Sequence, residues 1–328
     1  MPTDPSIFFS SEELSRYAAD VPHQKLIWPT FTQKKLSVYL RRDDIASEHY
    51  PGNKWYKLFY NLKAVIQSGQ KTILSFGGAY SNHIHALAAM GKQYRLNTVG
   101  VIRGYPPRVL SPTLQDAREW GMELLFLGHD DYRKKNLSQF SEQLRKQYDD
   151  YYCLPEGGDN LLGAKGCQAI AHGIGEHFSG EYTICCALGT GTTFAGIVSA
   201  IPEQVKCLGF SVLKGEDTLT EQVSQRLQDM GSLPPEWHIN NDYHHGGYAK
   251  TTPELLAFMQ AIEEANSLSL ESVKLESMKL EPMKLEPVYS AKMLWGIDQL
   301  AQQNYWPEGS TIIAVHGGGL QGRRGFTL

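Results

Sequence analysis

The stretch EYTICCALGTGTT, residues 181–193, decides the fold class of this chain. Its first part, 181–188, is a short and continuous apolar run, which is typical of a strand buried on both faces in a parallel sheet. A turn of glycine and threonine follows from Gly189 to Thr193, and the residues from Phe194 to Ala200 predict a helix that Pro202 closes. A strand, a glycine turn and a helix in this order form the repeating unit of an α/β fold.

The same order recurs on both sides of this stretch. Apolar residues from Trp55 to Ile66 have helical spacing, and Gly69 after them predicts the end of that helix. A second helix is predicted from Ser81, at its N-cap, to Met90, with Gly91 just after its end. Further short apolar runs predict strands at 36–40, 72–76, 98–102 and 311–315. This alternation indicates an α/β fold with mostly parallel sheets, whose ligands bind at the carboxyl ends of the strands.

Composition and charge narrow the class of protein. With 41% hydrophobic and 20% charged residues, the 328-residue chain can bury a sizeable core and is long enough for two domains. The chain has 31 Lys and Arg residues and 35 Asp and Glu residues, which gives a net charge of −4. A slightly acidic protein has no overall positive potential that would attract nucleic acid or an anionic membrane. We read no signal peptide and no membrane span, and expect a cytoplasmic protein. The 5 cysteines form no C-x-x-C pair and the histidines have no ligand spacing, so we expect no disulfide framework and no metal site.

A low-complexity segment stands apart from this pattern. Residues 274–288 read KLESM-KLEPM-KLEPV, and a period of five gives neither a helix nor a strand a constant face. Pro282 and Pro287 would also break a helix. We interpret 268–287 as a repeat-containing surface insertion, with a partner-binding role as the alternative.

Lys54 is the first residue that is suited to chemistry. It follows Gly52 and Asn53 at the start of a predicted helix. Partial burial and the positive end of the helix dipole would lower the pKa of its amine, and such a lysine can form a Schiff base. The alternative is an ordinary exposed lysine at a turn.

Two further turns are candidate binding sites. From Gly77 to His83, two glycines allow close approach of a ligand, and the N–H groups of the next helix can bind a carboxylate, beside Ser81 and Asn82. The alternative there is a plain helix cap. The turn after residue 188 can cradle a phosphate, and it consists of Gly189, Thr190, Gly191, Thr192 and Thr193. It has no Walker lysine, and Phe194 stands where a dinucleotide fingerprint needs glycine, which favours a mononucleotide or a phosphorylated cofactor over a dinucleotide. The alternative is a tight turn alone.

Together these stretches make the chain resemble one family of pyridoxal-phosphate (PLP) enzymes. That family contains 1-aminocyclopropane-1-carboxylate (ACC) deaminase and D-cysteine desulfhydrase, and it has the tryptophan-synthase-β-like fold. The matching stretches follow the family's order and span nearly the whole chain. They are Arg42-Asp43-Asp44, Gly52-Asn53-Lys54 with Lys57-Leu58, Gly77-Gly78 through Ser81-Asn82-His83, Pro155-Glu156-Gly157-Gly158, Gly189 to Thr193, and Glu286-Pro287-Val288-Tyr289-Ser290 with Lys292-Met293.

The resemblance implies a role for each candidate residue. Lys54 would be the Schiff-base lysine and the proton carrier, and Asn82 would hydrogen-bond the phenolic oxygen of the cofactor. The turn at 189–193 would hold its phosphate. Ser81 would help to hold the carboxylate of the substrate, which Tyr289 and Tyr248 would face.

Two departures from the family pattern bear on the substrate. ACC deaminases have Glu where this chain has Ser290, and that carboxylate pairs with the pyridine nitrogen. A hydroxyl leaves the ring neutral, as in desulfhydrase-like members. The residue before Ser81 is Gln in the better-known members and Tyr80 here, next to the place expected for the substrate.

The predicted function is therefore that of a PLP-dependent lyase or deaminase acting on a small amino acid, in the manner of D-cysteine desulfhydrase. The alternatives are an ACC deaminase, a PLP-binding protein without this catalysis, and a nucleotide-binding enzyme. The family also implies a homodimer. We expect a larger PLP-binding domain from residues 1–54 and 161–328, and a smaller α/β domain from 55–160 inserted into it, with the site in the cleft between them.

Overall fold

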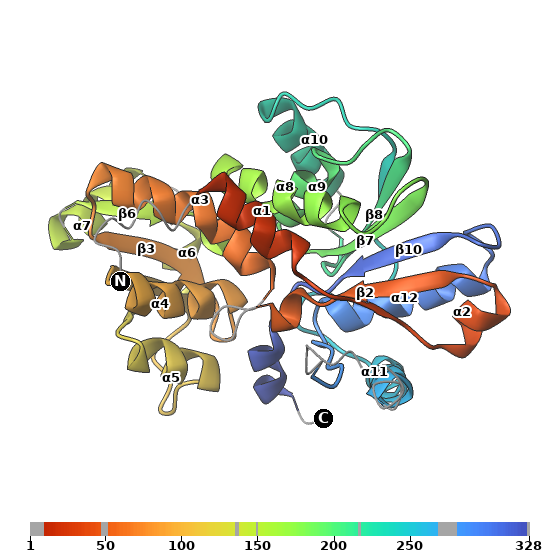
Figure 1. Cartoon of the computed structure of the whole chain (residues 1–328). Coiled ribbons are helices and arrows are strands. Elements are labelled where there is room, and N and C mark those ends of the chain that lie inside the picture. The colour runs from red at the N-terminus through yellow and green to blue at the C-terminus, as the bar shows by residue number, and fades with distance from the viewer. Residues whose placement is uncertain are drawn as a thin grey trace.

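A computed structural model describes residues 10–46, 52–134, 138–148, 150–215, 218–267 and 281–326, and arranges their strands in two sheets (Figure 1). The larger sheet has six strands in the order β1-β2-β10-β7-β8-β9. They are β1 (His23–Lys25), β2 (Ser37–Arg41), β10 (Thr311–Val315), β7 (Tyr182–Leu188), β8 (Val205–Ser211) and β9 (Trp237–Asn240). β1 pairs antiparallel with β2, and the other pairs are parallel.

The smaller sheet has four parallel strands in the order β5-β4-β3-β6. They are β5 (Glu123–Leu127), β4 (Asn97–Arg103), β3 (Thr72–Gly77) and β6 (Tyr151–Leu154). All four lie between residues 72 and 154, so the chain leaves the larger sheet after β2 and returns to it at β7. The domain boundaries predicted from the sequence stay a prediction, although this grouping of the strands agrees with them.

Helices cover the sheets on both faces. Those beside the larger sheet are α1 (Ser11–Ala19), α2 (Pro29–Gln33), α8 (Leu161–Gly175), α9 (Thr192–Val198), α10 (Leu219–Asp229), α11 (Pro253–Ser267) and α12 (Ser290–Gln302). Those beside the smaller sheet are α3 (Asn53–Ser68), α4 (Asn82–Tyr94), α5 (Pro112–Glu119), α6 (His129–Arg133) and α7 (Ser138–Tyr148). Three short 3-10 turns complete the description: η2 (Asp43–Ile45), η3 (Glu156–Gly158) and η5 (Leu320–Gly325).

The central strand β10 shows why its sequence is apolar without alternation. Ile313 and Val315 point into the hydrophobic cluster that contains α8 and α9, while Ile312 and Ala314 point into the cluster that contains α11 and α12. Successive side chains leave a strand on opposite faces, so a strand with helices on both sides needs apolar residues throughout. The prediction of an α/β fold with mostly parallel sheets is confirmed.

Two predicted helix ends are wrong. Gly91 lies inside α4, which ends at Tyr94 with Arg95 in the left-handed conformation at φ 56°. A Cβ on Gly91 would lie 2.4 Å from Thr98 Cγ2, so this glycine allows the helix to approach β4 rather than ending it. The helix α9 spans Thr192–Val198 instead of the predicted 194–200, because Gly191 at φ 75° forms its N-cap.

The predicted surface insertion at 268–287 is described only at its end, since 268–280 lie outside the described residues. In the part from 281 to 287, Met283, Leu285 and Glu286 are buried. This part is therefore packed against the larger sheet's helices and is not a surface spacer. No helix among the described residues is both long enough and apolar enough to cross a membrane.

Candidate active site

The first turn of α3, which carries Lys54, is pressed against the loop that follows β10. The Asn53 N–H donates to the Gly317 carbonyl oxygen at 3.2 Å. Gly52 has φ 87°, and a Cβ there would lie 2.1 Å from the same oxygen. Only glycine fits position 52, and this fixes where α3 begins and where its first side chains point.

The amine of Lys54 is connected to the glycine and threonine turn through Asn53. Lys54 Nζ donates to Asn53 Oδ1 at 2.6 Å, and Asn53 Nδ2 donates to Thr193 Oγ1 at 2.8 Å. Burial, followed by the nearby cation of Lys57, lowers the pKa of Lys54 to about 7. A substantial share of this amine is therefore unprotonated and nucleophilic near neutral pH.

A second buried lysine faces the turn at 189–193. Lys57 Nζ donates to the Gly157 carbonyl at 3.0 Å and reaches Thr190 Oγ1 at 3.5 Å. Thr190 Oγ1 in turn lies 2.9 Å from Thr192 Oγ1. Burial lowers the pKa of Lys57. No role for Lys57 was predicted from the sequence, although its spacing of three from Lys54 on one helix was a usable signal.

Ser81 and Asn82 lie together at the start of α4. Ser81 is the N-cap, and its Oγ accepts the Ile84 N–H at 3.3 Å. Ser81 therefore caps the helix, which was one of the two alternatives that the sequence offered. Its hydroxyl can still donate its hydrogen to another acceptor. The Oδ1 of Asn82 accepts from Gln321 Nε2 at 2.6 Å. Tyr80, just before them, is 47% exposed and packs against Gly325.

The two tyrosines predicted to face the substrate are neighbours. The rings of Tyr248 and Tyr289 have centroids 6.2 Å apart in an edge-on arrangement. A Cβ on Gly189 would lie 3.2 Å from the Tyr289 hydroxyl, which places this hydroxyl at the start of the 189–193 turn. Tyr248 is 46% exposed, and the buried Lys292 holds its loop by donating to the Gly247 carbonyl at 2.8 Å.

Ser290 is buried and its hydroxyl is engaged by the backbone. Ser290 Oγ accepts the Glu286 N–H at 2.8 Å and donates to the Glu286 carbonyl at 3.1 Å. The carboxyl of Glu286 accepts the Val288 and Tyr289 N–H groups at 2.6 and 2.8 Å, and burial raises its pKa to about 7. Glu286 thereby fixes the backbone from which Tyr289 projects. Glu286 belongs to one of the stretches that resemble the family, but no role for it was predicted from the sequence.

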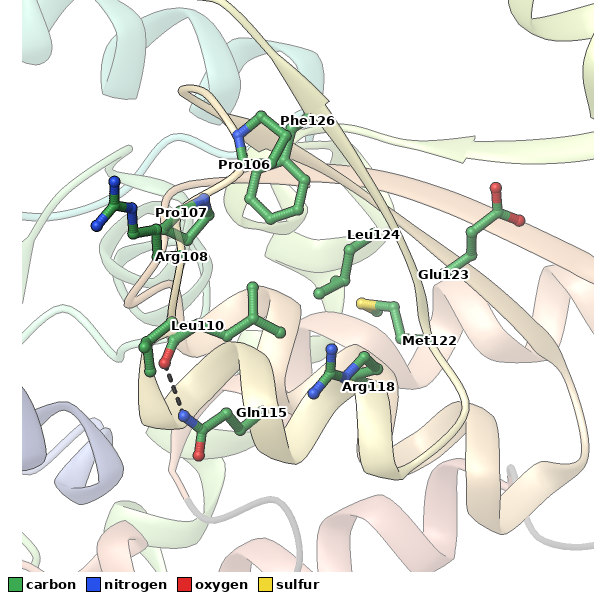
Figure 2. Close-up of a pocket in the computed structure, with 11 residues that line it drawn as sticks. Pro106, Pro107, Arg108, Leu110, Gln115, Arg118, Met122, Glu123, Leu124 and Phe126 are labelled. Atoms are coloured by element: carbon green, nitrogen blue, oxygen red, sulfur yellow. Dashed lines mark hydrogen bonds between the residues drawn. The ribbon is translucent and has the colours of Figure 1, made fainter.

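A separate pocket of about 590 Å³ opens beside β5 (Figure 2). The residues lining it lie between 106 and 126, in the loop before α5, in α5 itself and in β5. The predicted site residues come from other parts of the chain, at 54, 81–82, 189–193, 248 and 289–290. We therefore place the candidate active site around Lys54 and not in this pocket.

Comparison with known proteins decides the family. The family model described as pyridoxal-phosphate dependent enzyme matches residues 26–318. The chain belongs to this family. The predictions of a PLP enzyme and of its cofactor are thus confirmed.

Relatives within the PLP family carry the names expected from the sequence. The chain is 27% identical over 299 residues to the putative 1-aminocyclopropane-1-carboxylate deaminase of Thermotoga maritima, covering 87% of this chain and 89% of that protein. It is 26% identical over 309 residues to the mitochondrial bifunctional D-cysteine desulfhydrase/1-aminocyclopropane-1-carboxylate deaminase of Arabidopsis thaliana, covering 87% and 73%. A solved structure titled as an ACC deaminase homologue superposes with a TM-score of 0.74 at 23% identity, covering 98% of this chain and 97% of that one, which confirms the fold.

The residues around Lys54 fit PLP by their chemistry. An aldehyde requires an unprotonated amine, which Lys54 supplies with its pKa of about 7. A phosphate requires a cation and hydrogen-bond donors, which Lys57 and the threonine hydroxyls of the 189–193 turn supply. The buried Nδ1 of His83 also has no hydrogen-bond partner among the residues that the structure describes. These groups would hold the cofactor with its aldehyde toward Lys54.

Proposed function

We propose that this PLP enzyme is a lyase that eliminates a thiol from a small amino acid, as a D-cysteine desulfhydrase does. The net reaction would convert D-cysteine and water into pyruvate, ammonia and hydrogen sulfide. The observation that carries the proposal is the chain of hydrogen bonds from Lys54 through Asn53 to Thr193. It supports a reactive amine and a phosphate site that are joined through one residue, Asn53.

PLP supplies the electron sink that makes the Cα proton of a bound amino acid acidic. The amine of Lys54, a substantial share of which is unprotonated near neutral pH, would accept this proton. Ser81 and the N–H groups at the start of α4 would bind the substrate carboxylate, because that helix end attracts anions. Tyr289 and Tyr248 would close the other side of the substrate and exclude water from it.

ACC deamination is the second candidate, and the names of the relatives support it. ACC has no Cα hydrogen, so its ring must open at another carbon, and Ser81, Tyr289 or Lys54 would have to act there. ACC deaminases carry a carboxylate where this chain has Ser290, whose hydroxyl is bonded to the Glu286 backbone. A neutral group at this position favours the desulfhydrase reaction. A PLP-binding protein without either activity is the third candidate, motivated by Tyr80 and the repeat.

We propose further that the two sheets mark two domains, 1–54 with 161–328 and 55–160, and that the chain is a cytoplasmic homodimer. The sheet grouping supports the first point, and the family resemblance supports the dimer. Sedimentation at several concentrations measures the oligomer.

The test begins with the visible spectrum of the purified protein with PLP, before and after borohydride. A covalent bond to Lys54 gives an absorption band that borohydride abolishes, and leaves the reduced cofactor on the peptide containing Lys54. Lys54→Ala should lose both signals, while Lys71→Ala, at an exposed lysine, should keep them. Pyruvate release from D-cysteine and from ACC is then assayed side by side. Faster turnover of ACC would reverse the ranking of the two substrates, and a modified peptide that lacks Lys54 would refute the proposal.

A further inference from the structure

The chain after β10 runs between the two halves of the molecule and is attached to both (Figure 1). Arg323 forms an ion pair with Glu263 of α11 at 2.5 Å and also donates to the Leu285 carbonyl. The next residue, Arg324, forms an ion pair with Asp116 of α5, beside the smaller sheet. These contacts fix η5 relative to both sheets.

Residues 319–322 of this segment pack around the side chain of Asn82. Gln321 Nε2 donates to Asn82 Oδ1 at 2.6 Å. On the other side of the amide, a Cβ on Gly319 would lie 2.3 Å from Asn82 Nδ2, so only glycine leaves room for it. Gly322 is also close, since a Cβ there would lie 3.7 Å from Asn82 Oδ1. Residues more than two hundred positions away in the sequence thus hold this one amide.

The hydrogen bond from Gln321 determines which way the Asn82 amide faces. A glutamine NH2 group can only donate, so it selects the oxygen of Asn82 as its partner. The nitrogen of Asn82 is then the end that remains to donate to a ligand. If the Asn82 amide alone turned over, two donors would face each other at Gln321, at the cost of a partly buried hydrogen bond.

We propose that Gln321 is a positioning residue, which keeps the NH2 group of Asn82 directed as a donor to the phenolic oxygen of bound PLP. The proposal rests on the proposed function, because it takes from it that Asn82 meets this oxygen. Gln321 contacts Asn82 and would act on the cofactor only through it. The attachment of η5 to both halves makes the direction of this amide depend on the placement of one sheet against the other.

The experiment measures PLP binding to the cofactor-free protein and the pH at which the visible band of the bound cofactor changes. Gln321→Met keeps the length of the side chain and removes the donor. It should weaken PLP binding roughly three- to tenfold, the size expected for one lost hydrogen bond. Gln321→Glu keeps the shape but offers only acceptors, so Asn82 must turn its NH2 group away from the cofactor. It should weaken binding more and shift the pH of the spectral change. Gln303→Glu, at an exposed glutamine, is the matched control and should behave as wild type.

A double-mutant cycle with Asn82→Ala separates positioning from a merely structural role. If Gln321 acts through Asn82, then Gln321→Met should change PLP affinity less than about twofold in the Asn82→Ala background. Equal losses in both backgrounds, or variants of Gln321 that match the control, would overturn the inference while leaving the proposed function intact. If the wild-type protein forms no absorption band with PLP, the proposed function fails and this inference fails with it.

Discussion

The buried arginines at the end of β2 form ion pairs with carboxylates, whereas Lys54 and Lys57 of α3 form hydrogen bonds to neutral groups. Arg41 Nε lies 2.9 Å from Asp43, and Arg42 contacts both oxygens of Asp44 at 2.9 Å. Tyr56 completes the first pair by donating to Asp43 at 2.7 Å. Each of these charges has its counter-ion within two residues of the chain, and the cluster needs no ligand.

The site around α3 is built in the opposite way. Lys54 donates to an amide oxygen, and Lys57 donates to a carbonyl and reaches a hydroxyl. Burial lowers the pKa of both amines. A buried cation with neutral partners is costly, and such groups gather where a ligand supplies the missing charge. The contrast separates a cluster that stabilises the fold from one that, under the proposed function, would hold an anionic cofactor.

The largest effect on stability should come from breaking the buried ion pair between Arg41 and Asp43. Asp43→Asn removes the counter-ion of Arg41, which is fully buried. The free energy of unfolding should fall by about 3 kcal/mol, because a buried charge is left uncompensated. Urea unfolding of the cofactor-free protein measures this change. Asp131→Asn, in the exposed ion pair with Lys134, is the control and should change stability little. Equal effects of the two variants would contradict the distinction.

Removing a charge from the cluster of Lys54 and Lys57 should have the opposite effect on stability. Lys57→Met keeps a side chain of similar length and removes a buried cation that forms no ion pair with any described residue, so stability should stay the same or rise. PLP affinity should fall about tenfold or more, because the phosphate loses a charge-assisted hydrogen bond. Paired measurements of urea unfolding and PLP titration check both halves. A loss of stability as large as that of Asp43→Asn would show that Lys57 supports the fold instead.

The pH dependence of stability should also change. The pKa of Lys54 is about 7 in the folded protein, against 10.5 for a solvated lysine of the unfolded chain. Between these values the unfolded chain binds more protons, so the free energy of unfolding should rise as the pH increases from about 7 to 10.5. Lys54→Met should flatten this rise in the cofactor-free protein. Urea midpoints at about pH 7 and about pH 9 test it, and an unchanged slope would mean that the amine is solvated.

Local patterns in the sequence were sufficient for half of the described strands, namely β2, β3, β4, β7 and β10, and for the ends of some helices. The helix α3 ends at Ser68 with Gly69 at φ 75°, as its spacing predicted, and β10 has the predicted bounds. The end of α4 was predicted wrongly at Gly91. A glycine can end a helix, but it can also allow close packing inside one, and here it allows the contact with Thr98 of β4. The repeat led to the prediction of a surface insertion, which is wrong for residues 281–287. The five-residue period does not reveal that Met283 and Leu285 are buried in the core.

The same division holds for the site. The sequence by itself determined the α/β class and the PLP cofactor, and it predicted Lys54 and the segments that carry the other candidate residues, since each depends on residues close together in the chain. Only the tertiary structure placed Asn53 against Thr193, Lys57 against Thr190 and Gln321 against Asn82. These contacts join residues more than a hundred positions apart, and they form only when two sheets and their loops are packed together, so no local pattern encodes them.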